Sequence, residues 1–409
     1  MSSGSLWLLA WRNLWRHRRR TALTVLSVAA GLTGLVFGQS LLETIQLQLV
    51  GKSTGIHTGD LQVFDDKVSD FKFPDRWMKD PAKVDAVLRA DPDVAAFERR
   101  VVVTGLVSAK KDSAGVLFCG VEPARDPQVL TISRYVEEGR PLAPGGDGAF
   151  IGVDLAARLG VGLGDELVLM GTARDGSMGA ELAKVRGIFK TGSKTFDDQI
   201  VYVGIAKMQS LLGAEGTVND FVVRLRDPER LEPARTRLAA ALKGLPVQAV
   251  TWERIDAEIV GIRDYQDALL RIVLAVVFVI VALGILNTLL MSMFERVREF
   301  GLLMALGARR EFIGKLVVAE SVLMGALGAG LGLAAGAALI AYYARVGLAL
   351  PVKDAVNTFL PFDTVLYLRF DWPRHVWALA AVFGTSALSG LPPALKAMRL
   401  RPAEALRQI

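Results

Sequence analysis

Residues 295–312 read ERVREFGLLMALGARREF, and this charged, partly apolar stretch lies between two long uncharged ones at 272–294 and 321–344. Two more uncharged stretches cover residues 21–42 and 376–395. A helix needs about 20 apolar residues to cross the hydrocarbon core of a bilayer, and each stretch is long enough. Because buried helices of soluble proteins usually keep a polar edge, the four stretches predict four transmembrane helices.

The composition of the whole chain agrees with a membrane protein. Of the 409 residues, 52% are hydrophobic, and the mean hydropathy is +0.36. Soluble domains usually contain roughly 45–50% apolar residues even when glycine is counted. The first apolar stretch is too long for a cleavable signal peptide, and no clear small-residue cleavage site follows it. We therefore interpret it as a signal anchor.

The distribution of Lys and Arg predicts the orientation of the spans. The segments before the first span, between the second and third, and after the fourth are each net basic. By the positive-inside rule, both termini are expected in the cytoplasm. Residues 345–375 also carry basic side chains on the expected outer side, which departs from the rule. The basic residues thus indicate topology, and we expect no nucleic-acid partner.

The predicted fold is an α-helical membrane protein with four transmembrane helices and a large α+β extracytoplasmic domain inserted between helices 1 and 2. Strand-like runs such as GDLQVF and DELVLMG mix with helix-like runs such as PAKVDAVLRA in that domain. We also expect the helical segment 254–266 to continue into the second span. The expected boundaries are a cytoplasmic interfacial helix at 1–20, spans at 21–43, 272–294, 316–344 and 376–395, a periplasmic domain at 44–271, a cytoplasmic segment at 295–315, a periplasmic loop at 345–375 and a cytoplasmic tail at 396–409.

Tryptophan and arginine mark the N-terminal segment as interfacial. Trp7, Trp11 and Trp15 recur every four residues next to a cluster of arginines. Tryptophan favours the membrane interface and arginine favours the headgroups, so we expect a helix on the inner leaflet. A disordered basic tail is the alternative.

Small residues and one acid mark the third span. Gly328, Gly332 and Gly336 recur every four residues, so they line one helix face and predict the close approach of another helix. Glycine is common in membrane helices in general, which is the alternative explanation. Glu320 stands just before the uncharged stretch, and either a functional or partner contact or a simple interface anchor would explain it.

No motif in the chain requires catalysis. The segment GIFKTGSKTFDD at 187–198 comes nearest to a nucleotide-binding loop, but Ser193 separates the second glycine from Lys194. The acidic pairs at 65–66 and 197–198 are expected to lie in solvated turns. The three histidines are far apart in sequence and match no metal-site spacing. We expect a non-enzymatic chain with no metal or cofactor of its own, in which Cys119 is a buried core thiol.

With this layout, the chain resembles the permease subunits of the FtsX/MacB-type ABC transporter superfamily over essentially its whole length. The resemblance is carried by MSMFERVREFGLLMALGARREFIGKLVVAESVLMGALGAGLGLAAG, PPALKAMRLRPAEALR and ARLGVGLGDELVL. The segment GIFKTG…FDD with its flanking residues is similar to the Lol lipoprotein-releasing branch.

The resemblance implies that residues 295–315 form a coupling helix that fits a groove on a separate cytoplasmic ABC ATPase subunit, which binds ATP and Mg. An apolar ridge, charge pairs and small residues would make this contact. The residues implied are Val297, Phe300, Leu303 and Met304 for the ridge, Glu295, Arg296, Arg298 and Glu299 for the charge pairs, and Gly301, Gly307 and Ala308 for close approach or helix termination. A loop that contacts only lipid headgroups is the alternative.

The resemblance also implies mechanotransmission in a bacterial inner membrane by a pair of permease chains, identical or related. In the Lol branch such a pair extracts lipoproteins from the outer leaflet and passes them to a periplasmic carrier. By analogy, the substrate-lining residues would be Phe37, Leu41, Leu42 and Ile45, facing Leu269 and Ile272. The alternatives are a MacB-like export permease and FtsX-like transmembrane signalling to cell-wall hydrolases.

Overall fold

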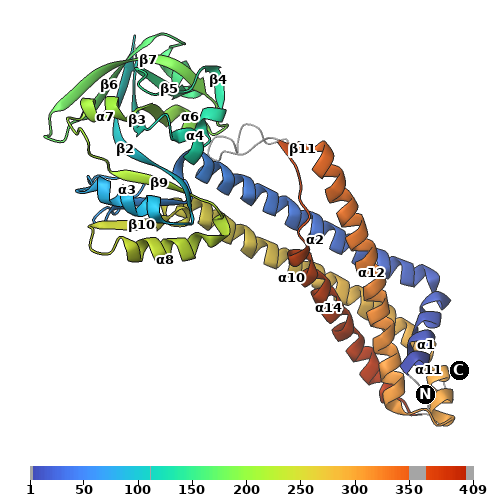
Figure 1. The fold of residues 1–409 in the computed structure, drawn as a ribbon. Coiled ribbons are helices and arrows are strands. Elements are labelled where there is room, and N and C mark those ends of the chain that lie inside the picture. Colours follow the sequence, from blue (N-terminus) through green and yellow to red (C-terminus); the bar gives the residue numbers. More distant parts are fainter. Residues whose placement is uncertain (1–2, 111, 350–364, 402–409) are drawn as a thin grey trace. The chain divides into compact units, whose positions relative to one another are not determined.

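The computed structural model describes residues 3–110, 112–349 and 365–401 (Figure 1). They form two compact units, which we call the helical unit (residues 3–45, 264–349 and 365–401) and the inserted domain (residues 46–263). Residues 1–2 of the predicted interfacial helix, residues 350–364 of the predicted loop 345–375 and residues 402–409 of the tail 396–409 lie outside the described residues.

Among the described residues, four helices are long and apolar enough to cross a membrane, and each contains one of the predicted stretches. They are α2 (Arg18–Ser53), α10 (Ala257–Glu295), α12 (Arg310–Val346) and α14 (Trp372–Met398). The remaining elements of the helical unit are α1 (Ser3–Arg16), α11 (Val297–Ala305) and the short strands β11 (Leu348–Ala349) and β12 (Val365–Leu366). Helix α10 starts well before the second apolar stretch, so the predicted continuation into that span is confirmed.

Hydroxyl side chains inside α2 bond to their own helix. Thr24, Ser27, Thr33 and Thr44 each donate to the carbonyl oxygen four residues earlier, at 2.8–3.2 Å. Such back-bonding satisfies a polar group where no water is present. These hydrogen bonds allow α2 to contain several hydroxyl side chains in an apolar environment.

The inserted domain is built on one ten-stranded sheet with the order β10-β1-β9-β2-β3-β8-β5-β7-β4, and β6 pairs with β2 and β7. Pairing is antiparallel except between β3 and β8 and between β5 and β7. The strands are β1 (Leu61–Asp65), β2 (Val94–Ala109), β3 (Asp112–Val121), β4 (Val136–Gly139), β5 (Gly148–Gly152), β6 (Glu166–Thr172), β7 (Met178–Phe189), β8 (Ile200–Gly204), β9 (Asp220–Leu225) and β10 (Val247–Thr251). The predicted α+β class is therefore confirmed.

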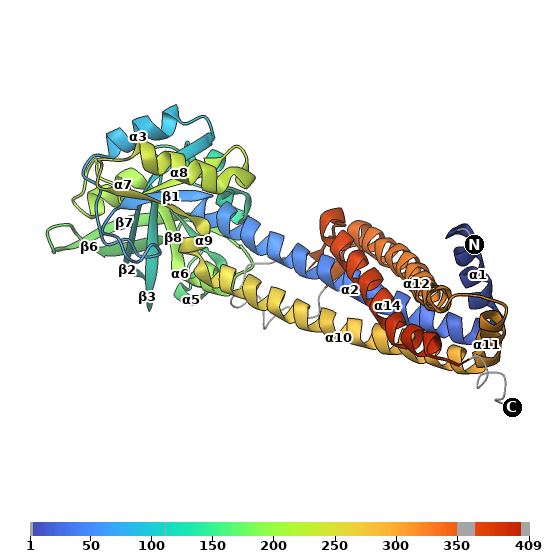
Figure 2. The same cartoon turned by 90° about the horizontal axis from the view of Figure 1, so that it is seen from below.

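The long strand β2 holds the two halves of the domain together. Its first part, Val94–Arg100, pairs with β9, and its second part, Val101–Ala109, pairs with β3. Helices α3 (Pro81–Ala90) and α8 (Leu231–Ala241) supply the core beside β1 and β9, and α5 (Val153–Leu159) and α7 (Ile205–Leu211) supply the core of the other half (Figure 2). The other helical segments are η1 (Thr54–Thr58), α4 (Asp126–Val129), η2 (Ile132–Arg134), α6 (Lys194–Gln199), η3 (Pro228–Arg230) and α9 (Trp252–Ile255).

A cluster of charged side chains is buried in this domain. The fully buried Arg100 donates to Glu98 Oε1 at 2.8 Å and to the carbonyl oxygen of His57 at 2.8 Å. Burial raises the pKa of Glu98 to about 8, although the Arg100 guanidinium acts in the opposite direction. Burial also raises the pKa of Asp220 to about 7 and of Asp126 to about 6. Protons are therefore held on this cluster well above the usual range of carboxyl groups.

Two sequence-based expectations about single residues have opposite outcomes. Cys119 is fully buried, as predicted, and burial raises the pKa of its thiol to about 12. The expectation of a solvated turn at Asp197 is wrong, because that side chain is buried. Its carboxylate accepts hydrogen bonds from Thr191 N at 3.0 Å and Thr191 Oγ1 at 2.7 Å, and so fixes the turn between β7 and α6. Asp65 is buried as well, while Asp66 is exposed.

Candidate coupling site

Helix α11 is a short element that ends in a tight turn beside the N-terminal helix α1 (Figures 1 and 2). Gly307 adopts φ +94°, a conformation that favours glycine, and α12 begins three residues later. The predicted segment 295–315 is therefore two helices separated by a turn. Val297, Phe300 and Gly301 are buried within the helical unit.

A buried ion pair connects α11 to its neighbours. Arg296 Nη1 donates to Glu320 Oε1 at 2.9 Å, and Asn13 Nδ2 donates to the same oxygen at 2.6 Å. The side chains of Arg296 and Glu320 are only 7% and 6% exposed, and the guanidinium lies 5.0 Å from the ring centre of Phe300. The network joins α1, the start of α11 and α12. Glu320 thus has its partners within this chain.

Further ion pairs hold the other charges of this segment. Glu299 accepts from Arg16 on α1 and from Arg296 Nε at 3.2 Å. Burial acts to raise the pKa of Glu299, but these hydrogen bonds outweigh it and lower the pKa. Glu295 accepts from Arg20 of α2 at 2.9 Å. Three of the four charges assigned to a partner ATPase are therefore paired internally.

The remaining charge and a row of leucines face outward. Arg298 is exposed and forms no ion pair with the residues that the structure describes. Leu302, Leu303 and Leu306 are 53%, 37% and 77% exposed. We call these four residues the coupling surface.

This surface differs from the ridge expected from sequence. Val297 and Phe300 pack inside the helical unit, Met304 is half-buried, and Leu303 alone of the four ridge residues is exposed. Leu302 and Leu306 were missed, although their spacing of four places them on one helix face. Asn13 was missed too, and an unpaired acid at the start of an apolar span was the signal that such a partner was needed. Gly307 and Ala308 line a groove of about 1340 Å³ that also includes Trp7.

The predicted glycine face of α12 lies against α2. A Cβ atom at Gly328 would lie 2.6 Å from Val28 Cβ, and one at Gly332 would lie 2.7 Å from the carbonyl oxygen of Ala29. At Gly336 the same atom would be 3.0 Å from Val36 Cγ1. Helix α2 can approach this closely only because these positions lack side chains.

The six residues expected to line a substrate path have different environments. The ring of Phe37 lies 5.8 Å from that of Tyr343 on α12, and Leu41 packs against the same helical core. Leu42 and Ile45 are half-buried, while Leu269 and Ile272 are exposed on α10. The structure thus places Phe37 in the packing between α2 and α12 and leaves the two α10 residues open to a partner.

Two family models cover most of the chain. Residues 21–241 match the MacB-like periplasmic core domain, and residues 271–402 match the FtsX-like permease C-terminal domain. The chain therefore belongs to the FtsX/MacB family of ABC transporter permeases. The family and the four apolar helices make it a permease-class protein of the inner membrane.

Several curated and solved proteins are similar to this chain. The lipoprotein-releasing system transmembrane protein LolC of Xylella fastidiosa (strain Temecula1) is 24% identical over 404 residues, which cover 96% of each chain. The macrolide export ATP-binding/permease protein MacB of Hyphomonas neptunium is 33% identical over 138 residues, or 34% of this chain and 19% of that protein. The solved periplasmic region of MacB from Actinobacillus actinomycetemcomitans is 11% identical, covers 50% of this chain and 94% of that one, and has a TM-score of 0.37.

Proposed function

We propose that this chain is the permease subunit of an ABC transporter that releases lipoproteins from the outer leaflet of the inner membrane to a periplasmic carrier. The observation that carries this proposal is the length of the similarity to LolC, which extends over 96% of both chains. The MacB protein of Hyphomonas neptunium is instead matched over only 19% of its length.

In this proposal both termini are cytoplasmic and the inserted domain is periplasmic. A separate ATPase subunit binds ATP and Mg, and its closure moves α11. The coupling surface supports such a contact because it combines exposed leucines with an exposed arginine that has no ion pair among the described residues. The chain itself performs mechanical transmission and no chemistry.

The buried network offers a route for that movement. Arg296 lies just before α11 and is tied to Glu320 of α12, which is tied to Asn13 of α1. A displacement of α11 should therefore move α12 and α1 as well. The Arg296–Glu320 pair resists separation, because breaking it would leave a buried charge without a partner. We propose that a second permease chain completes the assembly.

The first test isolates the tagged chain from its native membrane and identifies the bound proteins and lipids by mass spectrometry. We expect an ABC ATPase together with acylated lipoproteins. A cell-wall hydrolase recovered with the ATPase and without lipoproteins would replace release by transmembrane signalling. An outer-membrane duct protein would favour MacB-like export, which the match of residues 21–241 to the MacB-like core domain makes the second candidate.

A double variant tests the coupling surface by the same isolation of the tagged chain. Leu302→Asp combined with Leu306→Asp places two charges on the exposed leucine row and should abolish ATPase recovery. Leu182→Asp, on the exposed side of β7, is the matched control and should leave recovery unchanged. Equal recovery with both variants would mean that the ATPase does not bind α11 through this row.

A further inference from the structure

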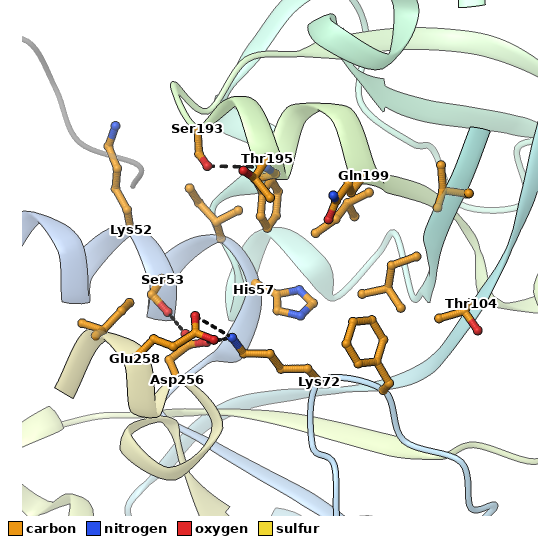
Figure 3. A pocket seen from close by; sticks show the side chains of 18 of the residues that line it. Lys52, Ser53, His57, Lys72, Thr104, Ser193, Thr195, Gln199, Asp256 and Glu258 are labelled. Atoms are coloured by element: carbon orange, nitrogen blue, oxygen red, sulfur yellow. Dashed lines mark hydrogen bonds and ion pairs between the residues drawn. The ribbon is translucent and has the colours of Figure 1, made fainter. Parts of the chain in front are cut away.

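The inserted domain contains a cavity of about 750 Å³ that the coupling function does not use (Figure 3). Its walls come from the end of α2 and from η1, β2, β3, α6 and the first turns of α10. Small-molecule sites typically have volumes of roughly 300–1,000 Å³, mostly apolar walls and a few polar groups. The cavity fits this description.

The apolar wall is mainly aliphatic. The branched side chains come from Ile56, Val116, Leu117, Ile200, Ile259 and Ile262, and Phe73 and Phe196 add two rings. With six aliphatic side chains against two phenyl rings, the wall offers more hydrocarbon surface than flat faces for the stacking of an aromatic ligand. It suits a flexible hydrocarbon chain.

The charged groups of the cavity balance one another. Lys72 Nζ lies 3.0 Å from Glu258 Oε2 and 4.0 Å from Asp256 Oδ1, and Ser53 donates a hydrogen bond to Asp256. Figure 3 shows these groups gathered on one side of the cavity. Lys52 donates to the carbonyl oxygen of Thr191 at 3.2 Å. The two ammonium groups are matched in number by the two carboxylates of Asp256 and Glu258, so the lining has no formal excess of positive charge to attract a carboxylate or phosphate.

His57 lies at the centre of the cavity, which is also lined by the neutral polar side chains of Thr104, Ser193, Thr195 and Gln199 (Figure 3). Its Nδ1 atom is buried and has no hydrogen-bond partner among the residues that the structure describes. Burial lowers the pKa of His57 to about 3, helped by the charges of Arg100 and Lys72, so the imidazole is neutral at physiological pH. A buried polar atom without a partner is costly, and a ligand with a neutral polar group would satisfy it.

We propose that this cavity binds the acyl chain of a lipid or lipidated molecule, with the ester or amide group of the ligand hydrogen-bonded to His57. The aliphatic wall contacts the hydrocarbon chain of the ligand, and the imidazole of His57 forms a hydrogen bond with its ester or amide group. The balanced charges of the cavity disfavour a ligand with an anionic group inside it. The site belongs to the inserted domain alone and is separate from the residues discussed for the helical unit. Binding of a ligand in this cavity requires neither ATP nor an ATPase. The proposed acyl-chain site can therefore be tested independently of the proposed lipoprotein release.

Photolabelling of the full chain in lipid nanodiscs tests the proposal. One probe is a phospholipid with a diazirine on its ester-linked acyl chain, and the other is an S-diacylglyceryl-cysteine peptide with the same chain. After illumination, mass spectrometry should find labelled peptides that contain Leu117 or Phe196. Labelling by the first probe alone identifies a membrane lipid as the source, and labelling by the second alone identifies a lipidated protein. Labels found with both probes only on the four long helices, and outside the cavity-lining residues 52–53 and 258–262, would overturn the proposal.

Gly115 offers a blocking variant that should still fold. It lines the cavity, and a Cβ atom added there would meet nothing within 4 Å. Gly115→Trp should therefore extend into free space and reduce labelling of the cavity peptides about tenfold. Gly115→Ala and the distant, exposed Leu182→Trp should label like the wild type. Undiminished labelling of a folded Gly115→Trp protein would refute binding in this cavity.

His57→Phe tests the polar contact separately. Phenylalanine preserves the ring that packs edge-on against Phe196 but cannot form a hydrogen bond. The wild type should prefer an ester-linked probe to its ether analogue by about fivefold, the effect of one hydrogen bond. The variant should lose this preference while still binding both probes. A preference that survives the substitution would exclude His57 as the contact.

Discussion

At the scale of single residues, Arg296 is the side chain on which the coupling site depends most. Arg296→Met should reduce the free energy of unfolding by about 3–5 kcal/mol, because it leaves the buried carboxylate of Glu320 unpaired. Thermal unfolding of the purified chain in detergent measures the loss. Arg298→Met removes an equal charge from the exposed face of the adjoining helix α11 and should have little effect. Equal losses in the two variants would show that burial of the ion pair is unimportant.

Glu98 controls part of the pH dependence of stability. Its pKa of about 8 in the folded protein exceeds its ordinary value of 4.5, so the folded chain holds a proton that the unfolded chain releases between these values. The free energy of unfolding should therefore fall as the pH rises from about 4.5 to 8, by an amount on the order of a few kcal/mol.

Glu98→Gln should flatten that decline, because an amide cannot release a proton and remains neutral like the protonated acid. Unfolding measured at pH 5 and pH 8 checks this. Glu138→Gln, on the exposed strand β4, is the control and should decline like the wild type. A wild-type slope in Glu98→Gln would mean that Glu98 is ionised throughout this range.

At the scale of elements, the glycine face of α12 controls how closely two helices pack. Gly332→Leu places a side chain where Ala29 and Leu32 of α2 leave no room, and it should lower the free energy of unfolding by about 1–3 kcal/mol. Gly330→Leu is the matched control, since a Cβ atom there meets nothing within 4 Å. The unfolding temperatures of the two variants measure this difference, and Gly332→Leu should unfold at the lower temperature. Similar temperatures would contradict a packing role for Gly332.

The elements themselves could be predicted from sequence because their signals are local. Uncharged stretches give the long helices, and short apolar runs give strands such as β1 and β6. The register of β2, which pairs with β9 and then with β3, depends on contacts between distant residues and has no local signal. Contacts between distant residues also determine which residues of the coupling site are buried and which are exposed. Sequence places Phe300 on an apolar ridge, but only its packing against Arg296 and the helical core shows which side of α11 faces inward.

At the scale of the whole molecule, α10 is the least covered of the four long helices, with 11% of its most apolar stretch buried against 39% in each of the others, and we expect a second permease chain to pack on it. Val276, Ile280 and Leu283 are all exposed on this helix. The single native cysteine is buried, and its raised thiol pKa keeps it unreactive. Ile280→Cys should therefore give a disulfide-linked pair of two copies in native membranes on oxidation. A pair with a related permease would need a second cysteine introduced on the facing helix of that chain.

Leu331→Cys on α12 is the matched control, because Leu331 is also exposed and apolar. It should remain uncross-linked under the same conditions. Cross-linking at Leu331 without cross-linking at Ile280 would move the interface from α10 to α12. The absence of both products would argue against a pair of identical chains that meets through α10 or α12.

The hydroxyl bonding of α2 has a consequence for how the protein is made. Ribosomes add about 5–20 residues per second, so residues 46–263 take about 10–40 s to synthesise after the first helix has entered the bilayer. During that interval neither α10 nor α12 exists, and the final neighbours of Thr24 and Thr33 have yet to be translated. Because the hydroxyls of Thr24 and Thr33 bond to their own backbone, they need no partner from a later helix while α2 lies alone in the bilayer. Ser40 differs, because its hydroxyl donates to the carbonyl oxygen of Arg369, which is made only after the whole inserted domain.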